Sequence, residues 1–226
     1  MINEMKTAAI VYSRSDSTRL PKKAFLPLGQ ISLISHVLLR SCKLNVDQII
    51  LATTNRSCDD EYEQLLKSDE LKGVKNINIF RGSCDNVVKR TIDALAANQI
   101  DRFCRINGDC PFFPYNHINN FIDNKKFSFI NNIRYRSFPY GISIEILDTE
   151  FYLNNSKNVK KEYQEHVTQH LYKHDKFLNE KCLFLNEINQ EYFETTRSYV
   201  IDTVDDYNFW SKKVKTDSLK PDTILL

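Results

Sequence analysis

A loop near the start of the chain combines cations with hydroxyl side chains: Arg14, Arg19 and Lys23, together with Ser13, Ser15, Ser17 and Thr18. Several cations and hydroxyls in one loop can neutralise and hydrogen-bond an anion of several charges, which a single surface lysine cannot do. Pro21 stiffens the loop, and the apolar residues 25–28 lead its far end back to the core. We therefore predict a triphosphate-binding loop, for which a solvated basic turn is the simpler alternative.

Two aspartates that lie far apart in the sequence each follow a predicted strand. Asp109 stands in the turn formed by residues 107–111, Asn-Gly-Asp-Cys-Pro, and Asp202 follows the apolar residues 198–201. The carboxyl ends of strands in an α/β sheet are where its ligands bind. Mg²⁺ takes one or two carboxylates and fills its other positions with water and phosphate oxygens. We therefore predict that both aspartates hold Mg²⁺, although each alone could be an ordinary turn or helix-cap residue.

The combination of a cationic loop with a metal site predicts a type of reaction. Phosphoryl and nucleotidyl transfer depend mainly on positioning and on charge stabilisation, which phosphate-binding cations and a bridging metal supply. The loop differs from a Walker-type P-loop, because it lacks the glycines and the Gly-Lys-Ser/Thr ending.

The elements that must position these residues follow an alternating pattern. Short apolar runs alternate with amphipathic stretches through the first two thirds of the chain, which predicts an α/β protein with a doubly wound, mostly parallel sheet. The predicted strands are residues 7–12, 48–53, 77–80, 102–106 and 127–130. The predicted helices are one that begins at a Ser32 or Ser35 cap, one over 59–66 and one over 86–97.

The alternation loosens after about residue 130. There the pattern indicates an apolar segment at 143–147, a helix over 160–173, a strand at 198–201 and a helix over 204–214. We expect residues 1–215 to form a single domain, with an arm, lid or dimerisation insertion at about 131–190, and residues 216–226 to form a tail.

The composition disfavours several classes of protein. The 226 residues carry a formal net charge of +2, with cations and anions mixed along the chain, so we do not expect a nucleic-acid partner. The six cysteines form no Cys-x-x-Cys pair, which favours reduced thiols in a cytoplasmic protein over a zinc site or a disulfide framework. Neither a signal peptide nor an apolar run of membrane-spanning length is evident, so we expect no membrane insertion.

The motifs together resemble the cytidylyltransferases of bacterial surface-sugar synthesis. The shared features are the Ser-Thr-Arg-Leu-Pro core of the loop, the Gly-Asp-x-Pro turn, the late Asp-Thr-x-x-Asp segment, and residues 81–87 and 165–168. They occur in collinear order from about residue 6 to 212. The branch that looks closest is the spore-coat polysaccharide type, related to the acylneuraminate and 3-deoxy-manno-octulosonate cytidylyltransferases. The resemblance implies a Rossmann-like nucleotidyltransferase fold.

The resemblance also implies roles for individual residues. In such enzymes the first loop holds the CTP phosphates, and the Gly-Asp turn and the late aspartate hold Mg²⁺. Carried over, Arg14, Arg19 and Lys23 become the catalytic phosphate ligands, and Asp109 and Asp202 the metal ligands. The expected nucleotide-binding residues are Ser13, Ser15, Ser17, Thr18, Ser83, Asp85, Arg90 and Asn107. A helix cap and a helix-face ion pair are the alternative roles for Ser83, Asp85 and Arg90.

The chain departs from the family pattern in two places. Asp16 and Lys22 stand where glycine is usual, so we expect a left-handed backbone at Asp16 and a cation such as Lys22 or Arg19 to offset its charge. Residues 139–143 read Pro-Tyr-Gly-Ile-Ser where Pro-Asp-Gly-x-Asp is common, which implies a different acceptor. The predicted acceptor-binding residues are Asn132, Arg136, Tyr140, Glu145 and His166, of which His166 could equally be a packed or capping histidine.

The resemblance implies transfer of CMP from CTP to a sugar acid or to a sugar or polyol phosphate, with release of pyrophosphate. Glu145 and a metal-bound hydroxide are the two candidate general bases, and homodimerisation is expected by analogy. The alternatives are a nucleotidyltransferase that uses another nucleotide, a glycosyltransferase on a similar sheet, and a catalytically impaired relative that still binds nucleotide. The Asp-x-Asp motif of many glycosyltransferases is missing after a suitable mid-chain strand. The retained aspartates and loop cations argue against the impaired relative.

Overall fold

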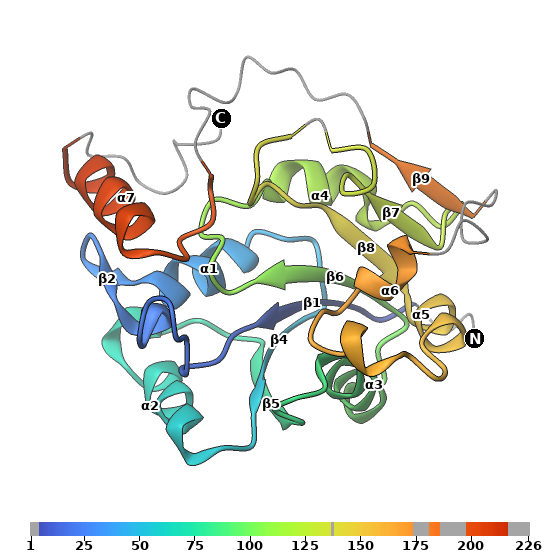
Figure 1. Cartoon of the computed structure of the whole chain (residues 1–226), viewed down its shortest axis with the longest axis horizontal. Helices are drawn as coiled ribbons and strands as arrows, with labels where there is room; N and C mark the ends of the chain where they lie inside the picture. The colour runs from blue at the N-terminus through green and yellow to red at the C-terminus, as the bar shows by residue number, and fades with distance from the viewer. Residues whose placement is uncertain (1–4, 137, 174–180, 186–197, 217–226) are drawn as a thin grey trace.

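A seven-stranded sheet is the framework of the computed structural model, which describes residues 5–136, 138–173, 181–185 and 198–216 (Figure 1). The strand order across this described sheet is β5-β4-β1-β6-β8-β7-β9. The strands are β1 (Thr7–Tyr12), β4 (Gln48–Thr54), β5 (Ile77–Gly82), β6 (Arg102–Asn107), β7 (Phe129–Asn131), β8 (Glu145–Asp148) and β9 (Cys182–Phe184). A separate ribbon pairs β2 (Pro27–Leu28) with β3 (Ile31–Ser32).

The first half of the sheet is parallel throughout. The central strand β1 pairs in parallel with β4 on one side and with β6 on the other, and β4 pairs in parallel with β5. The carboxyl ends of these strands therefore lie at one edge. In the second half β8 runs antiparallel to both β6 and β7, and β7 is parallel to β9. The prediction of a mostly parallel sheet is confirmed.

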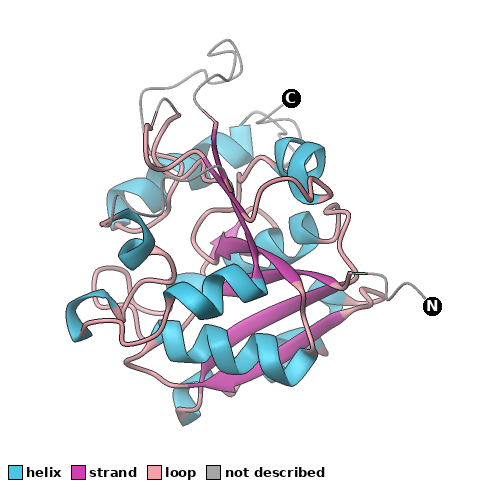
Figure 2. Ribbon diagram, turned by 90° about the vertical axis from the view of Figure 1, so that its right-hand side faces the viewer, coloured by secondary structure: helices cyan, strands magenta, loops and turns pink. Residues whose placement is uncertain are grey.

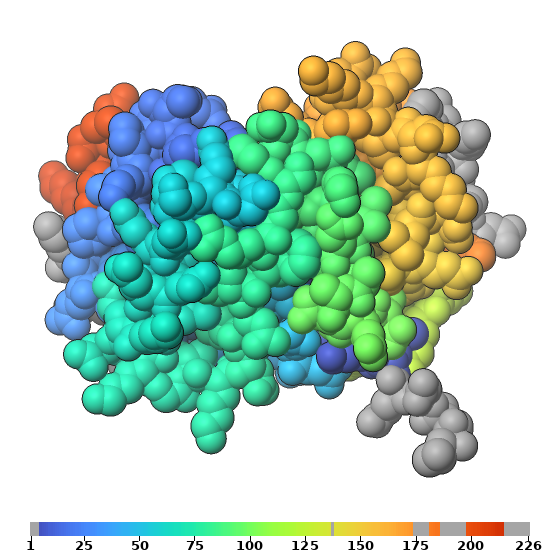
Figure 3. All heavy atoms as spheres, turned by 90° about the horizontal axis from the view of Figure 1, so that it is seen from below, coloured from blue at the N-terminus to red at the C-terminus, as the bar shows by residue number. Residues whose placement is uncertain are grey.

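Helices cover both faces of the sheet (Figure 2). The described helices are α1 (Leu33–Ser41), α2 (Glu61–Leu66), α3 (Val87–Asn98), α4 (Tyr115–Ile122), α5 (Thr149–Asn155), α6 (Gln169–Tyr172) and α7 (Val204–Thr216). Ala9 and Val11 of β1 join a hydrophobic core with α1, α2, α4 and α7, whereas Ala8 and Ile10 join a second core with α3 and α5. Seen from below, the green part of the chain that includes α3 lies between the blue N-terminal part and the gold part that includes α5 (Figure 3). The doubly wound arrangement predicted from the sequence is thus confirmed.

Side-chain caps fix where two of the helices begin. The Ser32 hydroxyl accepts a hydrogen bond from the backbone N–H of Ser35, so Ser32, one of the two predicted candidates, is the cap of α1. The Asn86 side chain accepts from the N–H of Lys89 at the start of α3. The helix predicted over 59–66 begins as an α-helix at Glu61, after a short 3₁₀ turn over Ser57–Asp59.

The single helix predicted over 160–173 is wrong. The structure has a 3₁₀ turn at Lys161–Tyr163 and the short helix α6, with residues 164–168 between them. Tertiary contacts engage that intervening segment, because the N–H of Val87 donates to the Gln164 carbonyl at 2.7 Å and the Tyr152 hydroxyl donates to the Val167 carbonyl at 2.9 Å. These carbonyl groups therefore bond outside the segment instead of within a helix.

The strand predicted at 198–201 is also wrong. The N–H of Tyr199 donates to the Tyr140 carbonyl at 2.7 Å, and the N–H of Ile201 donates to the Asp109 carbonyl at 2.9 Å. The segment is therefore held between two loops and pairs with no strand of the described sheet. Its contact with the Asp109 turn nevertheless brings Asp202 to the same edge of the sheet as β6.

Residues 131–190, for which the sequence predicts an arm, lid or dimerisation insertion, contribute to the sheet where the structure describes them. The strands β8 and β9 continue the sheet beyond β6, and α5 packs on one of its faces. The arm therefore remains a prediction for the rest of this range. No described helix is both long enough and apolar enough to cross a membrane.

Candidate active site

Two adjoining cavities lie at the carboxyl ends of β1 and β6. The first, called the loop cavity, has a volume of about 460 Å³, and the residues that line it alone include Ser13, Arg14, Ser17, Thr18 and Lys23. The second, called the Tyr140 cavity, has a volume of about 470 Å³, and the residues that line it alone include Arg136, Tyr140 and Ser143. The residues that line both cavities are Tyr12, Arg19, Arg105, Asn107, Asp109, His166 and Asp202. The predicted loop and both predicted metal ligands therefore meet in one place.

A carboxylate pair and a lysine form the point where the cavities meet. The Lys23 amino group donates to Asp109 at 2.7 Å and to Asp202 at 2.8 Å, and the Arg19 guanidinium pairs with Asp202 at 2.6 Å. Burial alone lowers the pKa of Lys23, but the two carboxylates outweigh burial and raise that pKa above its ordinary value. Lys23 is therefore a cation at neutral pH.

Glycine at position 108 permits the close packing that places Asp109. A Cβ atom there would lie 2.7 Å from the Ser13 Cβ and 2.8 Å from the Tyr12 carbonyl oxygen, both at the end of β1. Such contacts are too short for any side chain. The turn after β6 therefore lies directly against the start of the cation loop.

The donor set at this junction fits Mg²⁺. The carboxylates of Asp109 and Asp202 both lie within hydrogen-bond distance of the same Lys23 nitrogen, so they converge on one cation. Two carboxylates are what Mg²⁺ usually takes from a protein when phosphate oxygens and water complete its shell. Among the described residues no group of three or more His, Cys, Asp or Glu side chains surrounds a metal position.

Asp59 ties the cation loop to the end of β4, a role that the sequence analysis missed. Ser15 is buried against it: the Ser15 N–H and hydroxyl lie 2.9 and 2.7 Å from Oδ1 of Asp59. The Thr53 hydroxyl and the Thr54 N–H donate to Oδ2 at 2.8 and 3.0 Å. Burial raises the pKa of Asp59, but these hydrogen bonds outweigh burial and lower that pKa to about 2. Ser15 lines neither cavity and its hydroxyl is used by the fold, so a contact between Ser15 and nucleotide stays a prediction.

Asp16 is neutralised by partners other than those expected from the sequence. Its carboxylate pairs with Arg56 and, at 3.4 Å, with Arg14, whereas Lys22 pairs with Glu61. The left-handed backbone lies at Lys22, with a φ of 51°, and not at Asp16. Cations therefore offset the charge of Asp16 as expected, but they are Arg56, from the turn after β4, and Arg14, instead of Lys22 or Arg19. The expectation of a left-handed backbone at Asp16 was wrong.

The predicted nucleotide-binding residues of the 83–90 segment divide into two groups. Asp85 and Arg90 line the loop cavity, and Arg90 is only 3% exposed. Its guanidinium donates to the Ser83 carbonyl at 3.0 Å, while its Nε has no partner among the described groups, and burial lowers its pKa. Ser83 lines neither cavity, and its hydroxyl accepts from the N–H of Asn86 at 3.1 Å. Ser83 thus contacts Asn86, the residue that caps α3, and is not itself the cap; a contact between Ser83 and nucleotide stays a prediction.

The predicted acceptor-binding residues divide in the same way. Arg136, Tyr140, Glu145 and His166 all line the Tyr140 cavity. Asn132 does not, because its amide donates to the Ile142 carbonyl at 3.0 Å and its oxygen accepts from the N–H of Ile144 at 2.9 Å. Asn132 thus shapes the loop that carries Tyr140, and a contact between Asn132 and the acceptor stays a prediction.

Glu145 is buried and has several donors. It pairs with Arg105, and the hydroxyls of Thr168 and Tyr172 donate to it, the latter at 2.6 Å. Burial lowers the pKa of Arg105, but Glu145 outweighs burial and raises it. The oxygens of Glu145 are thus already engaged by a cation and two hydroxyls of the fold, which weakens Glu145 as a candidate general base. Arg105 was missed, although a cation inside the apolar run of β6 was a signal for it.

Comparison with known proteins places this geometry among related chains. The family model described as Cytidylyltransferase matches residues 8–217. An uncharacterized protein from Methanocaldococcus jannaschii is 29% identical over 211 residues, covering 91% of this chain and 82% of that protein. The spore coat polysaccharide biosynthesis protein SpsF of Bacillus subtilis is 26% identical over 210 residues, covering 88% of this chain and 82% of that protein.

Solved structures show the same fold. A cytidylyltransferase from Leptospira borgpetersenii serovar Hardjo-bovis superposes with a TM-score of 0.82 at 24% identity, covering 96% of this chain and 90% of that one. A CMP:2-keto-3-deoxy-manno-octonic acid synthetase complexed with CTP superposes with a TM-score of 0.65 at 14% identity, covering 94% of this chain and 99% of that one. At these identities the likeness concerns the fold alone.

Proposed function

We propose, because this chain belongs to the cytidylyltransferase family, that it transfers CMP from CTP to a sugar acid or to a sugar or polyol phosphate and releases pyrophosphate. The relative named as a spore coat polysaccharide biosynthesis protein supports a role in surface polysaccharide synthesis. The solved relative complexed with CTP supports CTP as the nucleotide.

The observation that carries the proposal is the meeting of the two cavities at Asp109, Asp202 and Arg19. In-line transfer needs the attacking oxygen and the leaving group on opposite sides of the α-phosphorus. A triphosphate in the loop cavity and an acceptor in the Tyr140 cavity would meet the carboxylate pair from two sides. One cavity alone would support nucleotide binding but not transfer.

The residues of the chain have distinct parts in the proposed reaction. An acceptor oxygen forms a bond to the α-phosphorus of CTP, and the bond to the bridging oxygen breaks, so that pyrophosphate leaves with the electron pair. Arg14, Arg19 and Lys23 stabilise the charge that gathers on this leaving group. Asp109 and Asp202 would hold Mg²⁺, which when bound supplies Lewis-acid polarisation of phosphate oxygens.

An arginine in the Tyr140 cavity favours an anionic acceptor. Glu145 is neutralised by Arg105, whereas Arg136 has no ion-pair partner among the described residues and lies with its guanidinium carbon 5.2 Å from the centre of the Tyr140 ring. An arginine that contacts an aromatic face keeps its edge donors for a carboxylate or phosphate. The 63% exposed Tyr140 ring adds an apolar surface for a sugar or polyol chain.

Thermal stabilisation by nucleotides tests the proposal. Purified protein is melted with CTP, UTP, ATP or GTP, each with and without Mg²⁺, since a ligand that binds the native state raises the melting temperature. A Mg²⁺-dependent rise that is selective for CTP is expected. Equal stabilisation by another nucleotide would contradict the CTP assignment, and CTP binding without pyrophosphate release for any acceptor would favour the catalytically impaired relative.

A further inference from the structure

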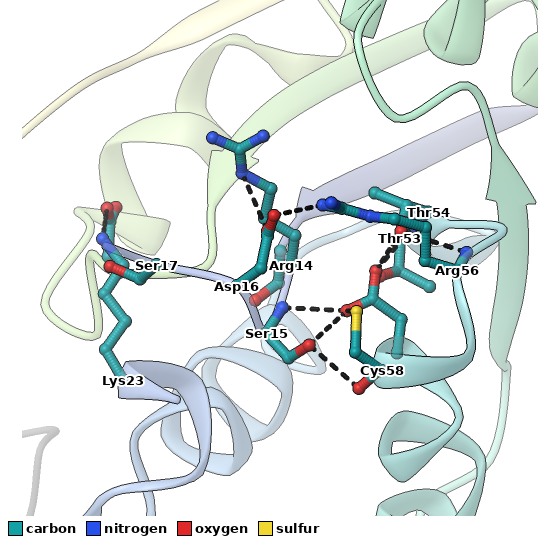
Figure 4. A network of polar contacts seen from close by, with 12 residues as sticks. Arg14, Ser15, Asp16, Ser17, Lys23, Thr53, Thr54, Arg56 and Cys58 are labelled. Atoms are coloured by element: carbon teal, nitrogen blue, oxygen red, sulfur yellow. Dashed lines mark hydrogen bonds and ion pairs between the residues drawn. The ribbon is translucent and has the colours of Figure 1, made fainter. Parts of the chain in front are cut away.

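The phosphate loop of this chain contains its own carboxylate, Asp16, which lies between two arginines from different parts of the fold. Figure 4 shows the carboxylate of Asp16 between Arg14, on the same loop, and Arg56, on the turn after β4. Asp16 lines neither the loop cavity nor the Tyr140 cavity, and nor does Arg56. Arg14 lines the loop cavity. The carboxylate therefore contacts the one arginine of this group that a ligand in the cavity would meet.

The contact uses only one edge of the Arg14 guanidinium. The group that faces Asp16 is Nε, at 3.4 Å from Oδ1. The two terminal nitrogens of Arg14 have no hydrogen-bond or ion-pair partner among the residues that the structure describes, and the side chain is 54% exposed. These terminal nitrogens form the fork that binds phosphate oxygens in pairs. Asp16 thus restricts the orientations that the Arg14 guanidinium can adopt, while the two terminal nitrogens remain open to phosphate oxygens.

The charge of Asp16 is offset on its other side. Its Oδ2 accepts a hydrogen bond from a terminal nitrogen of Arg56, whose side chain is 41% exposed. Without Arg56, the carboxylate would stand uncompensated beside a bound triphosphate and would compete with it for Arg14. With Arg56, the three side chains carry a net positive charge.

We propose that Asp16 and Arg56 are a positioning pair for Arg14: Asp16 orients its guanidinium toward the triphosphate, and Arg56 cancels the charge that this orientation introduces. The inference rests on the proposed function, because it assumes a triphosphate in the loop cavity. It predicts the opposite of simple electrostatics, which would have removal of a carboxylate tighten the binding of an anion. Neither residue touches the ligand, so both act through Arg14.

The test measures dissociation constants by calorimetry, with Mg²⁺, for CTP and for inorganic tripolyphosphate. Asp16→Ala should weaken the binding of both ligands by about tenfold, which is the worth of roughly one charge-assisted hydrogen bond between Arg14 and a phosphate oxygen. Arg56→Gln should weaken both to a similar extent in the wild-type chain, but by less than about twofold in the Asp16→Ala background, because no carboxylate is then left to neutralise. This dependence on Asp16 is a readout that a merely structural role of Arg56 would not produce.

Asp93→Ala is the matched control. It also removes a carboxylate from an exposed ion pair, with Lys89 on α3, and neither residue lines the loop cavity or the Tyr140 cavity. Its dissociation constants should equal those of the wild type, and melting temperatures without ligand should change little for all variants.

The outcomes separate this inference from the proposed function. Tighter or unchanged binding in Asp16→Ala, or an equal effect of Arg56→Gln in both backgrounds, overturns the positioning pair while CTP binding by the wild type stands. Tripolyphosphate binding that depends on Asp16, without any binding of CTP, upholds the pair and overturns the CTP assignment. A wild-type chain that binds neither ligand overturns both.

Discussion

Replacement of Asp59 by asparagine probes whether one buried carboxylate holds the cation loop in place. Asp59 is 1% exposed, and it accepts hydrogen bonds from two backbone N–H groups, of Ser15 and Thr54, and from the hydroxyls of Ser15, Thr53 and Thr54. The asparagine side chain would keep one acceptor oxygen and turn the other into a donor. The three hydroxyls can rotate to accept from it, but the backbone N–H groups cannot.

The structure gives the size of the effect. Oδ1 serves the Ser15 N–H and Oδ2 serves the Thr54 N–H, so either orientation of the new amide leaves one buried N–H facing another donor. An unsatisfied buried donor costs about 1–3 kcal/mol, and the remaining hydrogen bonds lose the strengthening that an ionised acceptor gives. We expect Asp59→Asn to lower the free energy of unfolding by about 3 kcal/mol at neutral pH.

The pH dependence of the loss identifies the carboxylate as its source. Although burial raises the pKa of Asp59, its hydrogen bonds bring it from 3.8 to about 2, so its contribution is complete above about pH 5 and is lost as the pH falls through about 2. The difference between wild type and variant, measured by urea unfolding at pH 7, 4 and 3, should therefore be largest at pH 7 and smallest at pH 3. A variant within about 0.5 kcal/mol of wild type at pH 7, the range of ordinary surface substitutions, would refute the reasoning.

Three further predictions concern the two cavities. Lys23→Met should show a larger Mg²⁺-dependent rise in melting temperature than wild type, because the Lys23 amino group contacts the same oxygens of Asp109 and Asp202 that a metal would take; an equal rise would contradict a metal site there. Tyr140→Ala should raise KM for the acceptor about 3- to 10-fold and leave KM for CTP unchanged, since an aromatic contact contributes about 0.5–1.5 kcal/mol. Steady-state kinetics with each substrate varied would show a rise in KM for the acceptor and for CTP alike if Tyr140 served the fold instead. Glu145→Gln should lower the free energy of unfolding by about 3–5 kcal/mol, because it leaves the Arg105 cation without its buried partner. An unchanged free energy of unfolding in urea would show that Glu145 does not stabilise the fold by pairing with Arg105.

The parts of the fold that could be predicted from the sequence are those with a local signal. The apolar runs of β1, β4 and β6 are continuous because helices bury both of their faces, so their positions and parallel order follow from the pattern. The segments at 160–173 and 198–201 could not be predicted, because their backbone groups bond to other parts of the fold: the first segment to residues of α3 and α5, and the second to the loops that carry Tyr140 and Asp109. Local periodicity carries no information about such partners.

The same distinction separates the site residues that were predicted from those that were not. Asp109 and Asp202 follow apolar segments that end at one edge of the sheet, and the structure brings both to Lys23. Ser15 and Asn132 have the chemistry of ligands, yet the fold uses both for hydrogen bonds of its own. A serine or an asparagine in a loop looks the same in the sequence whether it faces a cavity or the interior.

Pyrophosphate release tests the central claim most directly. The protein is incubated with CTP, Mg²⁺ and a panel of sugar acids and sugar or polyol phosphates, alongside an Asp109→Asn variant of confirmed folding. We expect release that requires both CTP and one class of acceptor, and a loss of about 10²–10³ in rate in the variant. A wild-type protein that binds CTP but releases no pyrophosphate with any acceptor, or a variant that is as active as wild type, would contradict the account.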